Sequence, residues 1–186
     1  MKNVHSVSTD NADVRKKVSL RSQAVAGLGS LRVLDLFAGN NVLWSHFDCE
    51  RYYGVEAIKG KGRNLHADNV RVIDSLDLSG FNVIDLDSYG VPANAVDKIF
   101  KNKSLQAGTI IIYTCISSGM CRMSKAIIRE FGLNSIYNKS KVLVNALAHD
   151  LFYGLLYNRG VRRVYKYTER TTFIKDYGYF VVGGDV

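Results

Sequence analysis

The chain has 186 residues, the size of one domain, and 47% of them are hydrophobic and 23% charged, as in an ordinary globular protein. Its formal net charge is +8, no apolar run reaches the ~18–20 residues of a membrane span, and the first 30 residues lack a signal peptide's apolar stretch. Cys49, Cys115 and Cys121 are odd in number and have no metal-ligand spacing, so we expect a reduced, cytoplasmic protein and exclude membrane, fibrous and secreted classes.

The first third of the chain is predicted to form one helix and two strands. Residues 1–12 are small and polar without any period, whereas residues 13–28 can form a basic helix with a weakly apolar side. The apolar run 31–37 predicts a strand, and a segment of helical character follows a turn at 41–47. A second strand is predicted at 52–57.

The middle of the chain continues to alternate between strands and helices. Residues 58–69 are interpreted as a loop or a short helix, and strands are predicted at 70–73 and 81–86. A helix is expected over 93–103. The run 109–115 is β-branched and apolar throughout, which is typical of a strand covered on both faces in the middle of a parallel sheet.

The last third is predicted to contain two helices followed by two strands. The helices are expected at 124–131 and 141–157, and the strands at 162–168 and 177–182. About eight residues separate these two strands, which is too few for a parallel crossover, so they should pair antiparallel.

This alternation predicts an α/β fold in which a mostly parallel sheet is covered by helices on both faces. Pro92 is the only proline, and no linker divides the chain. We therefore interpret residues 31–186 as a single domain and residues 1–30 as a basic N-terminal extension that carries a helix.

Positive charge is concentrated in the second half of the chain. Residues 31–97 contain 6 basic and 10 acidic side chains, whereas residues 98–186 contain 14 and 5. Such asymmetry favours a polyanionic partner near the C-terminal half, although a solvated basic face would have the same composition.

The most basic segment interleaves positive and aromatic side chains near the sixth strand. Basic side chains neutralise phosphates and aromatic rings stack on bases, so this segment predicts contact with nucleic acid. The candidate substrate-binding residues are Arg159, Arg162, Arg163 and Lys166. A second basic cluster, at 15–21, could likewise contact a nucleic acid or form a solvated basic face.

The first predicted strand is followed by an acidic and glycine-containing turn. Asp35 lies at the end of the strand and Gly39 lies in the turn, where a glycine lets the backbone approach a ligand closely. A dinucleotide fingerprint would need glycines where Asn41 and Trp44 stand. An acidic residue at the end of the first strand attracts a cationic ligand, such as a sulfonium or an ammonium, and repels a pyrophosphate.

Acidic residues also end the next two predicted strands. Glu56 follows Asp35 by 21 residues, a spacing at which an acid accepts hydrogen bonds from ribose hydroxyls. Asp74 ends the predicted third strand, where it could meet the edge of an adenine. Each acid alone could be a solvated strand end, whereas three in succession indicate one ligand site.

Three segments around these acids resemble the first three motifs of class I S-adenosylmethionine-dependent methyltransferases: Val33–Gly39, Tyr53–Glu56 and Val72–Asp74. The resemblance covers about residues 31–186. It implies a Rossmann-like sheet of seven strands in the order 3-2-1-4-5-7-6, the last strand antiparallel, with helices on both faces and S-adenosyl-L-methionine above strands one and two. The cofactor-binding residues that it implies are Asp35, Phe37, Gly39, Asn40, Asn41, Glu56, Ala57, Asp74, Ser75 and Asp85. The family's turn usually has a glycine where this chain has Asn41, but asparagine tolerates positive φ.

The end of the fourth predicted strand, D-S-Y-G-V-P at 87–92, resembles the D-P-Y/F-G-x-P signature of the tRNA guanine N2-methyltransferases, the dimethylguanosine family. Ser88 replaces the usual proline, and the chain resembles that family's catalytic core alone. The resemblance implies that Asp87 holds the target amine and Tyr89 stacks on the base, which must often leave its helix to be reached. Alternatively, Asp87 caps the following turn and Tyr89 packs beneath it.

The sequence thus favours an S-adenosylmethionine-dependent N-methyltransferase that acts on an exocyclic amine of a nucleic-acid base, in RNA rather than DNA. Two alternatives stay open: a methyltransferase of small molecules or proteins, and a binding module that has lost catalysis. So small a chain is expected to need a homodimer or a partner subunit for specificity.

Overall fold

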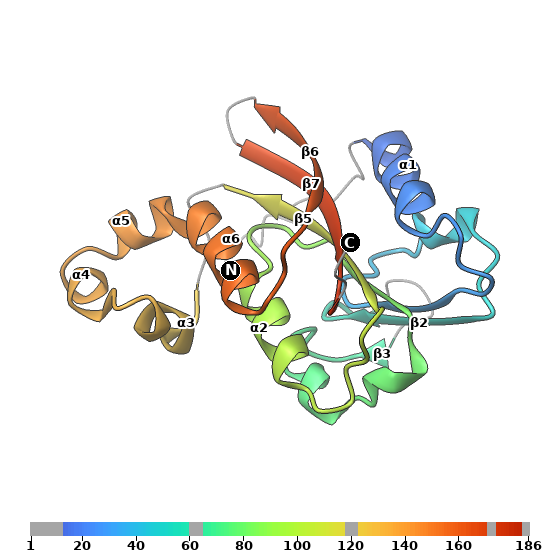
Figure 1. Cartoon of the computed structure of the whole chain (residues 1–186), viewed down its shortest axis with the longest axis horizontal. Helices are drawn as coiled ribbons and strands as arrows, with labels where there is room; N and C mark the ends of the chain where they lie inside the picture. Colours follow the sequence, from blue (N-terminus) through green and yellow to red (C-terminus); the bar gives the residue numbers. More distant parts are fainter. Residues whose placement is uncertain (1–12, 60–64, 118–122, 171–173, 184–186) are drawn as a thin grey trace, which may run out of the picture.

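A seven-stranded sheet in the order β3-β2-β1-β4-β5-β7-β6 forms the centre of the molecule in a computed structural model, which describes residues 13–59, 65–117, 123–170 and 174–183. The strands are β1 Arg32–Asp35, β2 Arg51–Glu56, β3 Leu65–His66, β4 Val83–Leu86, β5 Ile110–Ile116, β6 Tyr165–Arg170 and β7 Ile174–Val181. Strands β1 to β5 pair in parallel, and β7 runs antiparallel to both β5 and β6 (Figure 1). The predicted strand order and the antiparallel last strand are confirmed.

Helices cover both faces of this sheet. They are α1 Val14–Ala24, α2 Ala93–Lys101, α3 Lys125–Glu130, α4 Asn134–Lys139, α5 Lys141–Ala146 and α6 Ala148–Asn158, with short 3-10 helices η1 Trp44–His46, η2 Val72–Ser75 and η3 Leu78–Gly80. Figure 1 shows α1 on the opposite side of β5 and β7 from α2 and α6. Helices α3 to α5 lie together beside α6, at one end of the molecule.

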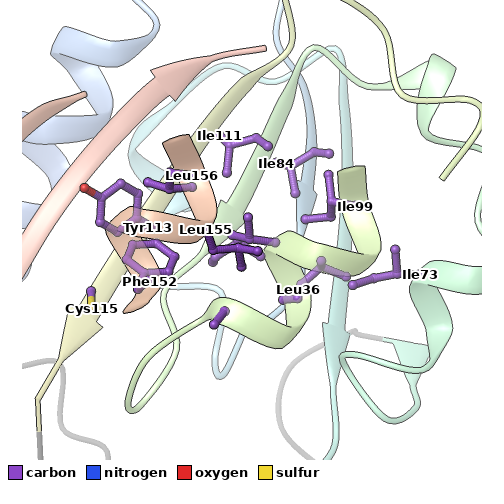
Figure 2. Packing of buried hydrophobic residues seen from close by; sticks show 14 of the residues in the cluster. Leu36, Ile73, Ile84, Ile99, Ile111, Tyr113, Cys115, Phe152, Leu155 and Leu156 are labelled. Atoms are coloured by element: carbon purple, nitrogen blue, oxygen red, sulfur yellow. The ribbon is translucent and has the colours of Figure 1, made fainter. Parts of the chain in front are cut away.

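The larger part of the core lies on the α2 and α6 side of the sheet. Ile84 and Ile111 from the central strands pack there with Ile99 of α2 and Phe152 of α6 (Figure 2). Successive side chains of a strand point to opposite faces, so a strand buried on both sides needs mostly apolar side chains on both faces. Strand β5 has one polar side chain, the buried Thr114, and is otherwise made of apolar and aromatic side chains, as its sequence predicts.

Helix α1 covers the other face over a second apolar cluster. Ala24 of the helix packs there with Val33, Val83, Ile112 and Trp44, all of them buried. Helix α1, predicted at 13–28 as part of a basic extension, therefore packs directly against the strands of the domain.

The predicted third strand at 70–73 is wrong. Residues Val72–Ser75 form the 3-10 helix η2, and the third strand is the two-residue β3 within the segment interpreted as a loop or helix. Ile73 lies on η2 and is completely buried, so this apolar segment contributes to the core as a helical turn and not as a strand. Four residues of apolar character do not distinguish a strand from one turn of helix.

Two predicted helices differ from the structure. The segment 41–47 contains only the single turn η1, and the long helix predicted at 141–157 is two helices that meet at Leu147. Helix α4 was not predicted, since its side chains are not buried and leave no apolar period. In the part of the chain that the structure describes, no helix is both long and apolar enough to cross a bilayer.

Candidate functional site

The candidate site lies at the edge where the parallel strands end. Strand β1 pairs with β2 on one side and with β4 on the other, so the loops that follow these three strands leave the sheet side by side. Asp35, Glu56 and Leu86 are the last residues of the three strands. In open α/β sheets this edge is where ligands bind.

The first loop turns at Gly39 and Asn41, which both adopt positive φ, 51° and 63°. A side-chain carbon built on Gly39 would meet no atom within 4 Å, so open space lies beside the turn. Asn41 adopts the left-handed conformation where the resembling family has glycine, and the Tyr52 hydroxyl lies 3.4 Å from its side-chain oxygen. Asparagine is among the residues that tolerate this conformation best, and so the turn is preserved.

Glu56 connects this turn to the second loop. Its Oε2 accepts a hydrogen bond from the Gly39 backbone N–H and its Oε1 accepts one from the Ile58 N–H, each at 3.0 Å. A carboxylate oxygen has two lone pairs, so each can accept a further hydrogen bond from a ligand. The open space beside Gly39 and the neighbouring carboxylate fit a ligand with a ribose.

Asp35 lies beneath the same turn. The side chain is buried; it accepts hydrogen bonds from the Tyr52 hydroxyl at 3.1 Å and from the Phe37 backbone N–H at 3.2 Å. Burial raises the pKa of Asp35 well above its usual range, and the negative charge of Asp85 raises it further. Asp35 therefore supports the turn from inside the fold.

Asp85 is completely buried and paired with α1. The guanidinium of Arg21 approaches its Oδ2 to 2.6 Å, and the indole Nε1 of Trp44 donates to the same oxygen at 2.6 Å. Burial raises the pKa of Asp85, and the positive charge of Arg21 opposes this rise. The sequence places Asp85 among the cofactor residues, whereas its carboxylate faces the core beneath α1.

Asp87 is two residues further along, just past the end of β4. Its Oδ2 accepts a hydrogen bond from Lys17 Nζ of α1 at 2.7 Å, and its Oδ1 accepts one from the Thr114 hydroxyl at 2.6 Å. Both of its oxygens thus face groups from other elements, so the alternative that Asp87 caps its own turn is wrong.

The loop 87–92 projects an aromatic ring from this edge. Gly90 fastens the loop to β5, since its carbonyl accepts a hydrogen bond from Ile116 N–H at 2.9 Å. The side chain of Tyr89 is 65% exposed, so the alternative that it packs beneath the loop is also wrong. An exposed ring beside a carboxylate can stack on a flat ligand.

The remaining predicted cofactor residues lie partly near the loops after β1 and β2 and partly on η2. Phe37 packs against the core, while Asn40 and Ala57 are exposed in the loops after β1 and β2. Asp74 and Ser75 lie on η2, where Asp74 pairs with Lys98 of α2, so the structure does not bring them to a strand end.

Asp68 follows β3 instead and was missed by the sequence prediction. It comes two residues after His66, which pairs with Glu56 across β2 and β3. Backbone N–H groups of Arg71 and Val70 donate to Asp68 and lower its pKa. The available signal was the Asp-Asn pair that follows Leu-His-Ala, but a two-residue strand gives no measurable period.

The predicted substrate-binding residues also have different surroundings. Arg159 is held by Asp97 at 2.6 Å and Glu130 at 2.7 Å, so its guanidinium links α6 to α2 and α3. Arg162 and Arg163 are exposed, each lying over a tyrosine ring. Lys166 contacts the buried Asp176 at 3.2 Å.

Within the described ranges, no three histidine, cysteine, aspartate or glutamate side chains are grouped closely enough to hold a metal ion.

Comparisons with known proteins relate the chain to others through its fold alone. No protein-family model and no curated protein matches the sequence. Two solved structures resemble it with a TM-score of 0.53: an S-adenosylmethionine-dependent methyltransferase from Archaeoglobus fulgidus, and Trm1 from Pyrococcus horikoshii in complex with S-adenosyl-L-methionine. The first is 15% identical, with 84% of this chain and 72% of that chain covered. The second is 13% identical, with 90% and 55% covered.

A third structure, the Escherichia coli protein yhhF, which is named as a methyltransferase, has a TM-score of 0.52 and 9% identity over 91% of this chain and 87% of its own. The chain therefore has the Rossmann-like fold of S-adenosylmethionine-dependent methyltransferases.

Proposed function

We propose that the protein is an S-adenosylmethionine-dependent methyltransferase that methylates an exocyclic amine of a nucleic-acid base, in RNA rather than DNA. The observation that carries the proposal is the arrangement of two half-sites on adjacent strands. The Gly39 turn and Glu56 follow β1 and β2, whereas Asp87 and Tyr89 follow β4, the other neighbour of β1. A methyl donor over the first half-site would thus lie beside an acceptor over the second.

The cofactor half-site would be made by three parts of the chain. Glu56 would accept hydrogen bonds from the ribose hydroxyls, the backbone at Gly39 would lie against the ligand, and Asp68 would approach the adenine from the end of β3. When bound, S-adenosylmethionine supplies a methyl group on a positively charged sulfur. The carboxylate of Glu56, at the end of β2, would attract such a cation.

The acceptor half-site suits an amine attached to a flat ring. The lone pair of an exocyclic amine is delocalised, so hydrogen-bond acceptors must hold its N–H groups and direct the lone pair at the methyl. Asp87 would accept one N–H, with Thr114 fixing the carboxylate, and Tyr89 would stack on the base. Transfer is in line, so positioning supplies much of the rate.

The preference for a nucleic acid is supported by the basic C-terminal half. The guanidinium groups of Arg162 and Arg163 lie 5.1 and 4.7 Å from the centroids of tyrosine rings, an arrangement that keeps flat cations at the surface. Such groups neutralise phosphates, and binding should therefore weaken as the salt concentration rises. A second copy or a partner subunit would add the specificity that so small a surface lacks.

The first experiment is a calorimetric titration of S-adenosylmethionine into the purified chain and into Glu56→Ala. We expect binding that weakens at least tenfold in the variant, since a hydrogen bond to a charged group contributes about 1.5–3 kcal/mol and a tenfold change is about 1.4 kcal/mol. Glu50→Ala is the matched control, because Glu50 precedes the opposite end of β2. Absent binding to a folded wild-type chain, or equal loss in both variants, would contradict the cofactor assignment.

A second experiment tests the acceptor half-site. The chain is incubated with labelled S-adenosylmethionine and either transfer RNA or single-stranded DNA, and label in the nucleic acid is measured. Asp87→Ala should abolish transfer while cofactor binding survives, and Tyr89→Phe should retain more activity than Tyr89→Ala. Equal loss of binding and transfer in Asp87→Ala would contradict the role of Asp87. Transfer only to proteins or small molecules would contradict the substrate class.

A further inference from the structure

Helix α1 brings an amine of the chain itself to the proposed acceptor position. Arg21 pairs with Asp85, and Lys17, one helical turn earlier, pairs with Asp87. The Arg21 guanidinium also donates to the Lys17 carbonyl at 2.9 Å, so the two cations are held together on one side of the helix. A buried ion pair thus fixes how α1 lies on the sheet, and with it the place of Lys17.

The nitrogen of Lys17 occupies the place where an acceptor amine would bind. Lys17 Nζ donates to Asp87 Oδ2 at 2.7 Å, while Thr114 holds the other oxygen. The side chains of Lys17 and Asp87 are only 13% and 9% exposed, so the pair is sheltered yet still reached by water. An external amine must either displace Lys17 or share the carboxylate with it.

Lys16 provides an internal contrast on the same helix. Its side chain is 50% exposed and pairs with Glu169 of β6, beside the ring of Tyr167. Two adjacent lysines therefore both pair with carboxylates, but only one of these carboxylates is the proposed acceptor-binding group.

We propose that Lys17 is a self-methylation site, at which the chain methylates its own side-chain amine. The inference rests on the proposed function, because any amine held by Asp87 beside the methyl donor is a possible acceptor. It adds an acceptor within the chain to the nucleic acid proposed above.

The transfer balances as an ordinary N-methylation. The Lys17 ammonium first releases one proton to water, and a remaining N–H keeps donating to Asp87 while the freed lone pair attacks the methyl carbon. A carbon–nitrogen bond forms and the carbon–sulfur bond of S-adenosylmethionine breaks, with its electron pair left on sulfur. The products are a methylated lysine, which keeps its positive charge, and the neutral thioether.

The direct test uses the full chain and S-adenosylmethionine with a deuterated methyl group, followed by mass spectrometry with fragmentation that separates residue 16 from residue 17. We expect a heavy methyl on Lys17 and none on Lys16, at a rate that does not depend on protein concentration. Lys17→Arg and Asp87→Asn should both lose the label. Label on Lys16, or no label on Lys17, would overturn the proposal.

A second readout needs no cofactor. Acylation of surface amines should modify Lys17 severalfold more slowly than Lys16, and Asp87→Asn should remove most of this difference. Equal reactivity of the two lysines in the wild-type chain would show that the contact with Asp87 does not hold Lys17, and would overturn the proposal.

These results separate this proposal from the proposed function. Transfer to an external nucleic acid without label on Lys17 would overturn self-methylation alone. A folded chain that does not bind S-adenosylmethionine would overturn the proposed function and self-methylation with it.

Discussion

Replacing Arg21 by methionine removes the cation that contacts the buried carboxylate of Asp85. The side chains of Arg21 and Asp85 are 1% and 0% exposed, so neither water nor a rearranged surface residue can take over easily. Leaving a buried charge without its partner costs about 3–5 kcal/mol. Because Trp44 still donates to the carboxylate, we expect the lower end, about 3 kcal/mol of the free energy of unfolding.

The double variant Arg21→Met/Asp85→Asn separates the ion pair from the packing of the arginine. Asparagine keeps an oxygen for Trp44 but carries no charge, so most of the lost stability should return. The coupling between the two positions should be about 2 kcal/mol. Arg15→Met is the matched control, because Arg15 is an exposed cation of the same helix and should change stability by less than about 0.5 kcal/mol.

The loss should also depend on pH. Burial raises the pKa of Asp85, and Arg21 opposes this rise, so the pKa rises further when Arg21 is removed. Between the pKa of about 3.9 in the unfolded state and the raised pKa in the folded state, the folded state holds a proton that the unfolded state has released. The free energy of unfolding of Arg21→Met should therefore fall as the pH rises between these two pKa values of Asp85. Its loss relative to the wild-type chain should be larger at about pH 8 than at about pH 5.

Urea titrations followed by circular dichroism measure these quantities. A deficit below about 1 kcal/mol with an unchanged dependence on urea would contradict this cost, since it would mean that the pair is not buried in solution. A double variant no more stable than Arg21→Met would assign the loss to packing instead of charge.

Substitutions at three further positions have effects that the structure predicts. Gly178→Ala should cost about 1–3 kcal/mol in a thermal unfolding assay, because the new carbon would lie 2.5 Å from the Tyr113 hydroxyl. Asn41→Val should cost about 1–2 kcal/mol and weaken cofactor binding by calorimetry, whereas Asn41→Gly should keep both, since only the valine is strained at positive φ. Arg159→Met should cost about 2 kcal/mol near neutral pH. Its hydrogen bond lowers the pKa of Glu130, so this loss should diminish in urea titrations as the pH falls through that pKa.

The order of the sheet followed from the resemblance to the methyltransferase family, and two strand patterns agree with it. The mostly apolar β5 indicates a central, covered strand, and the short separation of β6 and β7 demands an antiparallel pair. The third strand could not be found in the same way. It consists of two residues, Leu65 and His66, which are a strand only because they pair with β2, and two residues are too few to show a hydrophobic pattern.

The two half-sites also combine features that the sequence predicts with features that it does not. Glu56 ends β2, and Gly39 and Asp87 follow β1 and β4, so sequence position alone predicts that they meet at one edge. The exposure of Tyr89 and the burial of Asp85 depend on which elements cover each face, and a strand-end position does not reveal that.

Local periodicity in the sequence was enough to predict each described strand except β3, and the short connection predicted that β6 and β7 pair antiparallel, whereas the order of the sheet followed from the family resemblance. The contacts of the basic residues of α1 could not be predicted, because they depend on how this helix packs in the folded chain. Four residues of helix rise about 6 Å and two residues of strand rise about 6.6 Å. Lys17 and Arg21 therefore match Asp87 and Asp85, but this match exists only when α1 packs on the sheet, since charge in a sequence carries no direction toward its partner.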